Sequence, residues 1–328
     1  MAAGGSTATV TEEFTQLADP YRNELLAYCY RMLGSVHDAE DQVQETLLRA
    51  WRSYSDFEGR SSMRTWLYRI ATNTCLRALE TRSRRPLPSG LGEPTEDPDG
   101  PVPVPHLDVP WLQPFPDALT GRGADDPAAV ITTRASMRLA LIAALQYLPP
   151  RQRAVLILRD VLGWHAAEAA GLLGMSTAAA NSALQRARAH IASLAPTEED
   201  ILEPADPKLK ELLEHYTAAF EAADVAGLTE LLRADAVLEM PPMAVWFAGR
   251  DRVSRFLGRR VLVRPGDFTL RPVQANGQPA FAAYERGAAG RHEAHAIQVL
   301  TVTANGISRI VSFNDGGLLA AFGLPDHA

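Results

Sequence analysis

The chain has 328 residues, of which 46% are hydrophobic and 22% charged, and its formal net charge is −7. This length predicts two or three domains of ordinary globular composition. No apolar run reaches the about 18 residues of a membrane-spanning helix, and the N-terminus lacks the basic start and apolar core of a secretory signal. We therefore expect a cytoplasmic protein in which Cys29 and Cys75 are reduced core thiols, and the eight scattered histidines predict no metal site.

Positive charge is concentrated in two stretches of an otherwise acidic chain. Residues 60–85 contain seven arginines and a single acid, Glu80. Residues 135–195 contain six arginines and two acids, Asp160 and Glu168. A phosphate-facing surface needs local positive charge and not a basic protein overall, so the net charge does not exclude DNA binding.

The first 85 residues predict an all-helical domain, with boundaries at residues 10–85. Helical spacing of apolar residues covers 12–33, Gly34 and Ser35 interrupt it, and further helices follow over 37–56 and 62–84. No strand-like alternation occurs between them. In the second helix Ala39, Val43, Leu47 and Trp51 repeat at four-residue intervals.

The third helix and the loop before it, from Phe57 to Cys75, mix aromatic and basic residues. Phosphates attract guanidinium groups, whereas an unstacked base needs a flat side chain or a tight pocket. A helical wheel separates two sides, so that one can pack while the other meets DNA. The packing side consists of Leu67, Ile70, Ala71, Thr74 and Ala78. The other side consists of Trp66, Arg69, Asn73 and Arg77.

Proline, glycine and acids dominate the next segment and predict an extended linker over residues 86–128. Bulky apolar residues interrupt it between Asp108 and Asp117, in the sequence DVPWLQPFPD. Two interpretations stay open for this motif: an anchor that docks on a neighbouring domain of the same chain, or a docking motif for a partner.

Residues 129–195 return to helical patterns and predict a helix-turn-helix. Gly174 suits a left-handed turn residue, and Ser176 or Thr177 can cap the next helix. Small and amide side chains on the outward face of that helix would let it approach base edges in the major groove. The inward positions are Ala180, Leu184, Ala187 and Ile191. The outward positions are Ala178, Asn181, Ser182 and Gln185, flanked by Arg186 and Arg188.

Residues 206–328 predict an α+β domain with a curved antiparallel sheet. Helices are expected over 207–223, 225–233 and 250–258, and the Asn-Gly pairs at 276 and 305 predict hairpin turns. The expected strands are Ala236–Met240, Ala244–Ala248, Phe268–Gln274, Ala280–Glu285, Glu293–Thr303 and Ile307–Phe313.

Two stretches resemble bacterial sigma factors of the extracytoplasmic-function type. FEGRSSMRTWLYRIATN, with Asp38 to Trp51 upstream, resembles the promoter-melting domain, and LPPRQRAVLILRDVLGWHAAEAAGLLGMSTAAANSALQRARAHI resembles the domain that reads the minus-thirty-five element. The resemblance covers roughly residues 14–85 and 135–195. One departure is the run from Ala178 to Asn181, which lacks the family's usual lysine and leaves the base preference open.

This resemblance implies three sets of binding residues. For the minus-ten element, where a non-template base would be captured, they are Arg60, Ser62, Arg64, Trp66, Arg69, Asn73 and Arg77. For the minus-thirty-five element they are Ser176, Ala178, Asn181, Ser182, Gln185, Arg186 and Arg188. For the clamp helices of core RNA polymerase they are Asp38, Glu40, Asp41, Gln44 and Glu45.

The C-terminal sequence AAFEAADVAGLTELLRADAVLEMPP resembles the opening of the cone-shaped SnoaL-like α+β fold, which hosts both enzymes and non-enzymes. The linker motif and the Asp-Gly-Gly segment near the end resemble regulatory contacts in sigma factors that carry an extra domain. The interdomain candidates are Trp111, Phe115, Asp315 and Gly316. The side chains considered for proton transfer are Asp235, Glu239, His292, His295 and Asp315.

These proton-transfer candidates form no recognisable constellation, because His292 and His295, three residues apart, would face opposite sides of a regular strand. We therefore expect a sigma factor that binds core polymerase and promoter DNA, has no catalytic residue, cofactor or metal, and is regulated in cis by its C-terminal domain. The alternative is a SnoaL-like small-molecule enzyme or sensor fused to a helix-turn-helix regulator. An unidentified small ligand of the C-terminal domain stays open in either case.

Overall fold

A computed structural model describes residues 12–101, 104–120, 134–194, 201–204 and 206–328. The chain forms two compact units: Met1–Arg84 with Leu119–Pro196, and Arg85–Ala118 with Thr197–Ala328. Much of the segment predicted as a linker, residues 85–118, thus belongs to the second unit. The expected boundaries at residues 10, 128, 129 and 195 lie outside the described residues.

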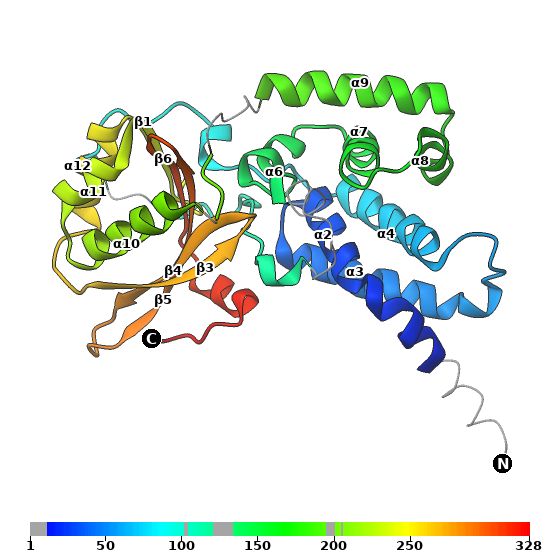
Figure 1. Ribbon diagram of the computed structural model, residues 1–328, viewed down its shortest axis with the longest axis horizontal. Helices are drawn as coiled ribbons and strands as arrows, with labels where there is room; N and C mark the ends of the chain where they lie inside the picture. The colour runs from blue at the N-terminus through cyan, green and yellow to red at the C-terminus, as the bar shows by residue number, and fades with distance from the viewer. Residues whose placement is uncertain (1–11, 102–103, 121–133, 195–200, 205) are drawn as a thin grey trace, which may run out of the picture. The chain divides into compact units, whose positions relative to one another are not determined.

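The first unit is built from helices, as predicted (Figure 1). The expected single helix over 12–33 is wrong in one respect: a 3-10 turn, η1 (Asp19–Tyr21), interrupts it, because Pro20 cannot donate a backbone hydrogen bond. Its α-helices are α2 (Arg22–Leu33), α3 (Val36–Arg52), α4 (Met63–Glu80), α6 (Leu139–Leu145), α7 (Pro150–Leu156), α8 (Ala166–Leu173) and α9 (Thr177–Leu194), with a 3-10 turn η2 (Tyr54–Asp56) after α3 and a π-helical turn η5 (Ile157–Val161) after α7.

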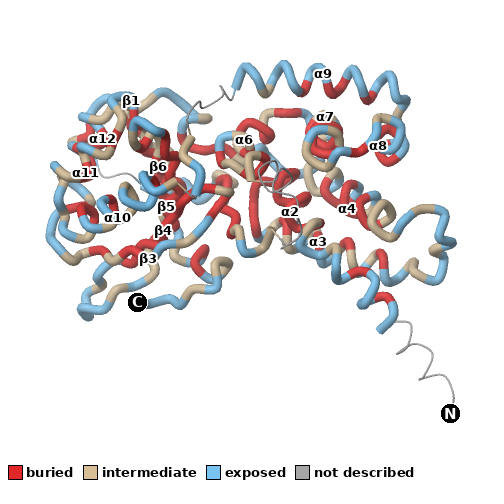
Figure 2. Tube along the Cα trace, viewed as in Figure 1, coloured by how far each residue is buried: buried red, intermediate tan, exposed pale blue. Residues whose placement is uncertain are grey.

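Helix α2 is the centre of this unit, and every residue from Leu25 to Leu33 is buried (Figure 2). The Arg153 guanidinium of α7 reaches the end of α2, where it donates to the Met32 carbonyl. It also donates to the Gln146 side chain (2.9 Å) and to the Leu148 carbonyl (3.2 Å). Burial lowers the pKa of Arg153 to about 10, so the side chain stays charged at neutral pH and these acceptors stabilise it.

The second unit combines three helices with a six-stranded sheet. Its helices are α10 (Pro207–Glu221), α11 (Val225–Leu231) and α12 (Arg250–Arg260). Its strands are β1 (Leu232–Glu239), β2 (Trp246–Ala248), β3 (Phe268–Ala275), β4 (Gln278–Arg286), β5 (His292–Thr303) and β6 (Gly306–Phe313), in the order β2-β1-β6-β5-β4-β3. All six strands were predicted, but the expectation of a fully antiparallel sheet is wrong, because β1 and β6 run parallel. Parallel neighbours need a long crossover connection, and here almost the whole domain lies between β1 and β6 in the chain.

One face of the sheet is covered by α10, α11 and α12 (Figure 1). Tyr216 and Phe220 of α10 pack on Phe281 and Phe268 of the sheet, with ring centroids 5.4 and 5.5 Å apart. The β3–β4 turn uses the predicted Asn-Gly pair, since Asn276 and Gly277 both adopt left-handed backbone angles. These elements form the apolar core of the second unit.

Candidate nucleic-acid interface

Helix α4 separates a buried and an exposed side much as its sequence predicts. Ser62 caps it by accepting a hydrogen bond from the Thr65 backbone N–H (3.1 Å). Arg69, Asn73 and Arg77 are exposed and lie one turn apart, and the helix ends on the exposed Glu80. The buried positions include Leu67, Ala71 and Thr74, while Ile70 and Ala78 are half-buried. The exposed stripe offers two cations and an amide to a ligand.

Three other predicted minus-ten residues lie in different surroundings. Trp66 is half-buried and packs on Phe57, with ring centroids 4.7 Å apart. Arg60 is exposed and pairs with Glu58. Arg64 is half-buried and donates to Glu24 through Nε (2.7 Å). Desolvation alone would lower the pKa of Arg64, but the hydrogen bond and charge of Glu24 raise it overall. Arg64 is therefore engaged by Glu24 and does not extend the exposed stripe.

Helix α9 presents the surface expected of a recognition helix. Ala180, Leu184 and Ala187 are buried and Ile191 is half-buried. Gly174 is left-handed, with φ +62°, and the Ser176 hydroxyl accepts from the Ala179 N–H (3.1 Å). All seven residues predicted for the minus-thirty-five element are exposed: Ser176, Ala178, Asn181, Ser182, Gln185, Arg186 and Arg188. Of these, Arg188 is engaged, since it donates twice to the Asp160 carboxylate (2.9 and 2.7 Å).

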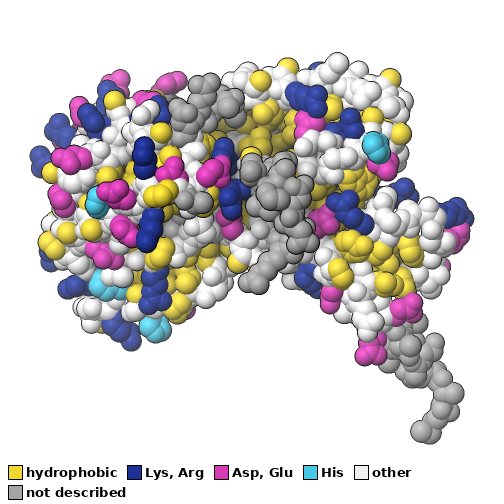
Figure 3. Space-filling view, viewed as in Figure 1, with side chains coloured by type: hydrophobic (Ala, Val, Ile, Leu, Met, Phe, Trp, Pro, Cys, Tyr) yellow, Lys and Arg dark blue, Asp and Glu magenta, His cyan; other side chains and the backbone are white. Residues whose placement is uncertain are grey.

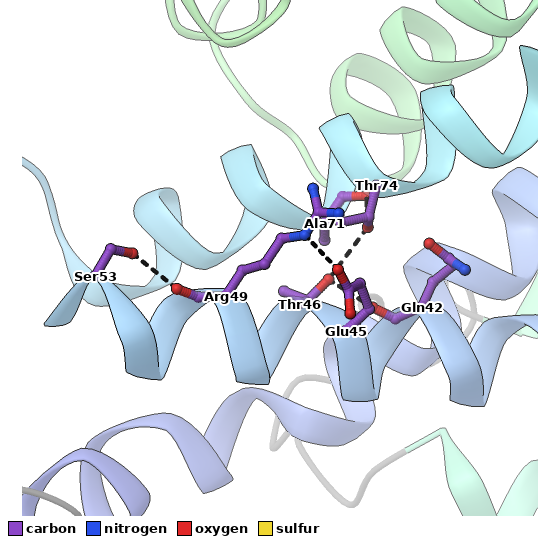
Figure 4. A network of polar contacts seen from close by, with 7 residues as sticks. All are labelled: Gln42, Glu45, Thr46, Arg49, Ser53, Ala71 and Thr74. Atoms are coloured by element: carbon purple, nitrogen blue, oxygen red, sulfur yellow. Dashed lines mark hydrogen bonds and ion pairs between the residues drawn. The ribbon is translucent and has the colours of Figure 1, made fainter.

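The predicted polymerase-binding residues share helix α3, and two of their carboxylates already have partners. Asp38 pairs with Arg82, and Glu45 pairs with Arg49 one turn along the helix (Figure 4). Asp41 and Gln44 are exposed, and Glu40 is half-buried. In the same network Thr46 contacts Thr74 of α4 (3.3 Å), which holds α3 against α4.

Helix α3 also exposes two large apolar side chains that sequence reasoning missed. Leu48 and Trp51 are 41% and 40% exposed. The four-residue repeat that ends at Trp51 does not mark one buried face, because a spacing of four residues drifts by about 40° per step on a helix of 3.6 residues per turn. The buried stripe instead runs through Thr46 and Ala50. An apolar stripe that follows the helical period would have placed Trp51 at the surface.

The linker motif docks on the turn between β3 and β4 within the second unit. Phe115 is fully buried, and its N–H donates to the Asn276 side chain while its carbonyl accepts from the Asn276 N–H, both at 2.9 Å. Asp117 accepts from the Gly277 N–H (2.8 Å). Trp111 is buried, and its indole N–H donates to the His106 carbonyl (2.8 Å). Of the two interpretations of this motif, the contacts within the second unit agree with an anchor that docks on a domain of the same chain.

The side chains considered for proton transfer do not converge. Asp235 pairs with Arg233, which lowers the pKa of the carboxyl. Glu239 is fully buried, pairs with Arg309 and accepts from the Ser89 N–H (2.9 Å).

The two histidines of β5 have separate partners as well. His292 contacts the Gly266 carbonyl (2.9 Å), whereas His295 contacts Glu285 (3.1 Å) at a register shift between β4 and β5. Desolvation lowers the pKa of His295, and the charge of Glu285 opposes this shift. Because the register of β5 against β4 changes at His295, the regular strand assumed in the prediction is not present there.

The Asp-Gly-Gly segment begins a terminal 3-10 helix, η6 (Gly316–Phe322). The exposed Asp315 accepts from the Gly317 N–H (3.0 Å), and a Cβ on Gly316 would lie 2.4 Å from the Ala294 carbonyl of β5. Gly316 is therefore required for this close approach. Within the described part of the chain, no group of three or more His, Cys, Asp or Glu could hold a metal ion, and no helix is long and apolar enough to cross a membrane.

Comparison with known proteins decides the family. Residues 17–85 match Sigma-70 region 2, residues 138–191 match Sigma-70 region 4, and residues 213–313 match the SnoaL-like domain. The sequence is 51% identical over 316 residues to the ECF RNA polymerase sigma factor SigG of Mycobacterium tuberculosis (strain ATCC 25618 / H37Rv), covering 96% of this chain and 84% of that protein. The chain is an ECF RNA polymerase sigma factor.

A second relative is similar over most of its length. The ECF sigma factor SigJ of the same strain is 30% identical over 278 residues, covering 82% of this chain and 80% of SigJ. The crystal structure of Mycobacterium tuberculosis SigJ superposes with a TM-score of 0.60, at 25% identity, over 95% of this chain and 98% of that one. Sigma factors bind core RNA polymerase and promoter DNA and are not enzymes, so this sigma factor is a transcription initiation factor with a C-terminal SnoaL-like domain.

Proposed function

We propose that this sigma factor opens its promoter with the exposed face of α4. Arg69 and Arg77 would hold phosphates, and Asn73 would contact an unstacked non-template base. Arg60 and Ser62 precede this face in the loop, while Arg64 and Trp66 act from inside by positioning it. The observation that carries the proposal is the alignment of two arginines and an asparagine over a buried α4 side. The polymerase on which the protein acts lies in the cytoplasm, where we expect the protein as well.

We further propose that α9 reads the minus-thirty-five element through Asn181 and Gln185, with Ser176, Ala178, Ser182, Arg186 and Arg188 beside them. Changing Asn181 or Gln185 to Ala is expected to reduce discrimination against single-base substitutions in that element by about 1–3 kcal/mol. Competition binding of holoenzyme to a set of promoter variants measures this. His190→Ala, an exposed change farther along α9, is the matched control. Equal discrimination by all three variants would reject base readout by these side chains.

We also propose that the C-terminal domain regulates this sigma factor in cis by holding the segment between its two DNA-binding domains. Region 2 ends near residue 85 and region 4 begins near residue 138, so the docked residues 85–118 belong to their only covalent connection. Phe115 and Asp117 anchor this segment at the β3–β4 turn, while Trp111 fixes its course. These contacts support a domain that restrains the linker. They do not support catalysis, because the candidate side chains for proton transfer do not converge. Asp315 and Gly316 are candidates for a further regulatory contact.

Releasing the linker is expected to raise transcription. Phe115→Ala removes a fully buried ring, which typically costs about 3–5 kcal/mol, enough to undock the segment. We expect promoter-specific transcription with core polymerase to rise about tenfold, the effect of about 1.4 kcal/mol on an equilibrium. Leu107→Ala, a change in the same segment at a side chain that is 85% exposed, is the control. Unchanged transcription and promoter choice in Phe115→Ala, with the linker shown by proteolysis to be released, would exclude regulation through this contact.

A further inference from the structure

Helix α12 of the SnoaL-like domain carries a row of arginines on its outward side. Its inward residues Val253, Phe256 and Leu257 belong to the domain core. Figure 3 shows Lys and Arg side chains gathered with a few acids at the edge of the molecule where Figure 1 places α12. The exposed residues of the helix are Asp251, Arg252, Arg255, Arg259 and Arg260. This surface is locally basic within a chain of net charge −7.

Three of these arginines converge on oxygen atoms of the linker. The carboxylate of Asp99 pairs with Arg255 and lies 3.5 Å from Nε of Arg259. Arg260 donates to the carbonyls of Gly100 (2.7 Å) and Asp99 (3.3 Å). Three guanidinium groups therefore surround one carboxylate and two neighbouring carbonyl oxygens. This is an anion-binding arrangement, occupied by a segment of the same chain.

The bound linker leaves much of the positive charge of this site uncompensated. Asp99 supplies one negative charge to three arginines, and the side chains of Arg255 and Arg259 remain 60% and 68% exposed. Ion pairs at such exposure contribute little stability, because water and salt screen them. Asp99 is therefore an occupant that a more highly charged ligand can displace.

We infer that Arg255, Arg259 and Arg260 form a binding site for the phosphate backbone of duplex DNA, and that Asp99 competes with DNA for it. From Arg255 to Arg260 the row is about 7.5 Å long. One strand of B-DNA carries about two phosphates over that length of the helix axis. Guanidinium groups bind phosphate oxygens as they bind carboxylate oxygens, and here two of them share the carboxylate of Asp99.

The composition of this face favours DNA over a protein partner. Between Arg250 and Arg260 every large apolar side chain turns inward, so the face lacks the apolar centre typical of protein interfaces. A row of arginines flanked by one acid instead suits contacts that depend on charge and not on base sequence. The inference rests on the promoter-binding function of this sigma factor and adds a third DNA contact from the C-terminal domain.

The test compares the affinity of holoenzyme for promoter DNA over a range of salt concentrations. The variant Arg255→Gln/Arg259→Gln/Arg260→Gln is expected to lower the slope of log K against log salt by about two, since each phosphate contact contributes about 0.9. Asp99→Asn, which removes the competing charge, is expected to bind promoter DNA more tightly than the unmodified chain. Both variants are full-length and assembled with core polymerase.

The matched control is Lys208→Gln/Lys210→Gln/Arg291→Gln, which removes three exposed cations of the same domain elsewhere on its surface. If the arginine variant has the same salt slope and the same affinity for promoter DNA as this control, the arginines only anchor the linker and the inference is overturned. Loss of core polymerase binding with unchanged DNA contacts would overturn it as well. Failure of the unmodified holoenzyme to bind promoter DNA would instead contradict the promoter-binding function itself.

Discussion

Replacing Arg69 and Asn73 by Ala is expected to reduce open-complex formation by about 10- to 100-fold while leaving polymerase binding nearly unchanged. Both side chains are exposed on α4, and neither contributes to its buried side. Stacking or capture of one base is worth about 1–3 kcal/mol, which corresponds to this range of rates. Open complexes are measured by permanganate reactivity of unpaired thymines, and polymerase binding by titration with a labelled chain.

The variant Asp41→Ala/Glu45→Ala on α3 is expected to impair polymerase binding more than open-complex formation. Loss of two carboxylates should slow and weaken association with core polymerase, because complementary charge mainly sets orientation and association rate. Once bound at saturating concentration, this variant should open the promoter normally. Arg22→Ala, an exposed change on α2, controls for general effects on the helical domain. If both double variants affected the same step equally, the proposed separation of the α3 and α4 surfaces would be wrong.

Region 4 is expected to move away from region 2 when the sigma factor binds its promoter. In the first unit the two regions pack together: Tyr68 of α4 lies 5.4 Å from Trp164 of region 4, measured between ring centroids. The minus-ten and minus-thirty-five elements are about 25 base pairs apart by their names, or about 85 Å along B-DNA. Helices α4 and α9 both pack on α7 and α8, and packed helices lie about 8–10 Å apart, so α4 and α9 approach within about 20 Å of each other. The packed arrangement cannot place α4 and α9 on both elements at once.

Energy transfer between labels measures this separation. Thr81→Cys and His190→Cys provide exposed positions near the end of α4 and on α9, while the native Cys29 and Cys75 are fully buried. Hydrogen bonding with Cys75 and burial raise the pKa of the Cys29 thiol, which reduces its reactivity further. Transfer should be high in the free chain and low in the promoter complex. A pair within region 2, Ser55→Cys with Thr81→Cys, should not change. High transfer in a complex that initiates transcription would contradict the movement.

Local sequence patterns predicted the helices and strands of this sigma factor well where a single local feature, such as alternation or a helical stripe, determines the element. Strands β3 to β6 followed alternation joined in pairs by two Asn-Gly turns, and α9 followed a helical stripe of small apolar residues. The parallel pairing of β1 with β6 could not be predicted, because it depends on contacts between strands at opposite ends of the domain. The four-residue repeat that ends at Trp51 did not mark one buried face, because a strict spacing of four drifts around the helix.

The exposure of the candidate binding residues was predictable from the sequence, but the contacts that some of them make were not. The sequence pattern indicated the exposed stripe Arg69, Asn73 and Arg77, which depends only on the helical period. It could not show that Arg64 pairs with Glu24, 40 residues away, or that Asn276 binds the backbone of Phe115. Such pairs join residues distant in sequence, and a single chain carries no local signal for them.

The most direct test of the account is transcription by core RNA polymerase supplemented with the purified full-length chain on a library of promoters. We expect the chain to bind core polymerase and to direct transcripts from a subset of templates that share a minus-ten and a minus-thirty-five sequence. The chain alone should bind the same duplexes much more weakly than the holoenzyme does. A chain that fails to associate with core polymerase at low salt, or that binds these duplexes equally well without it, would contradict the account.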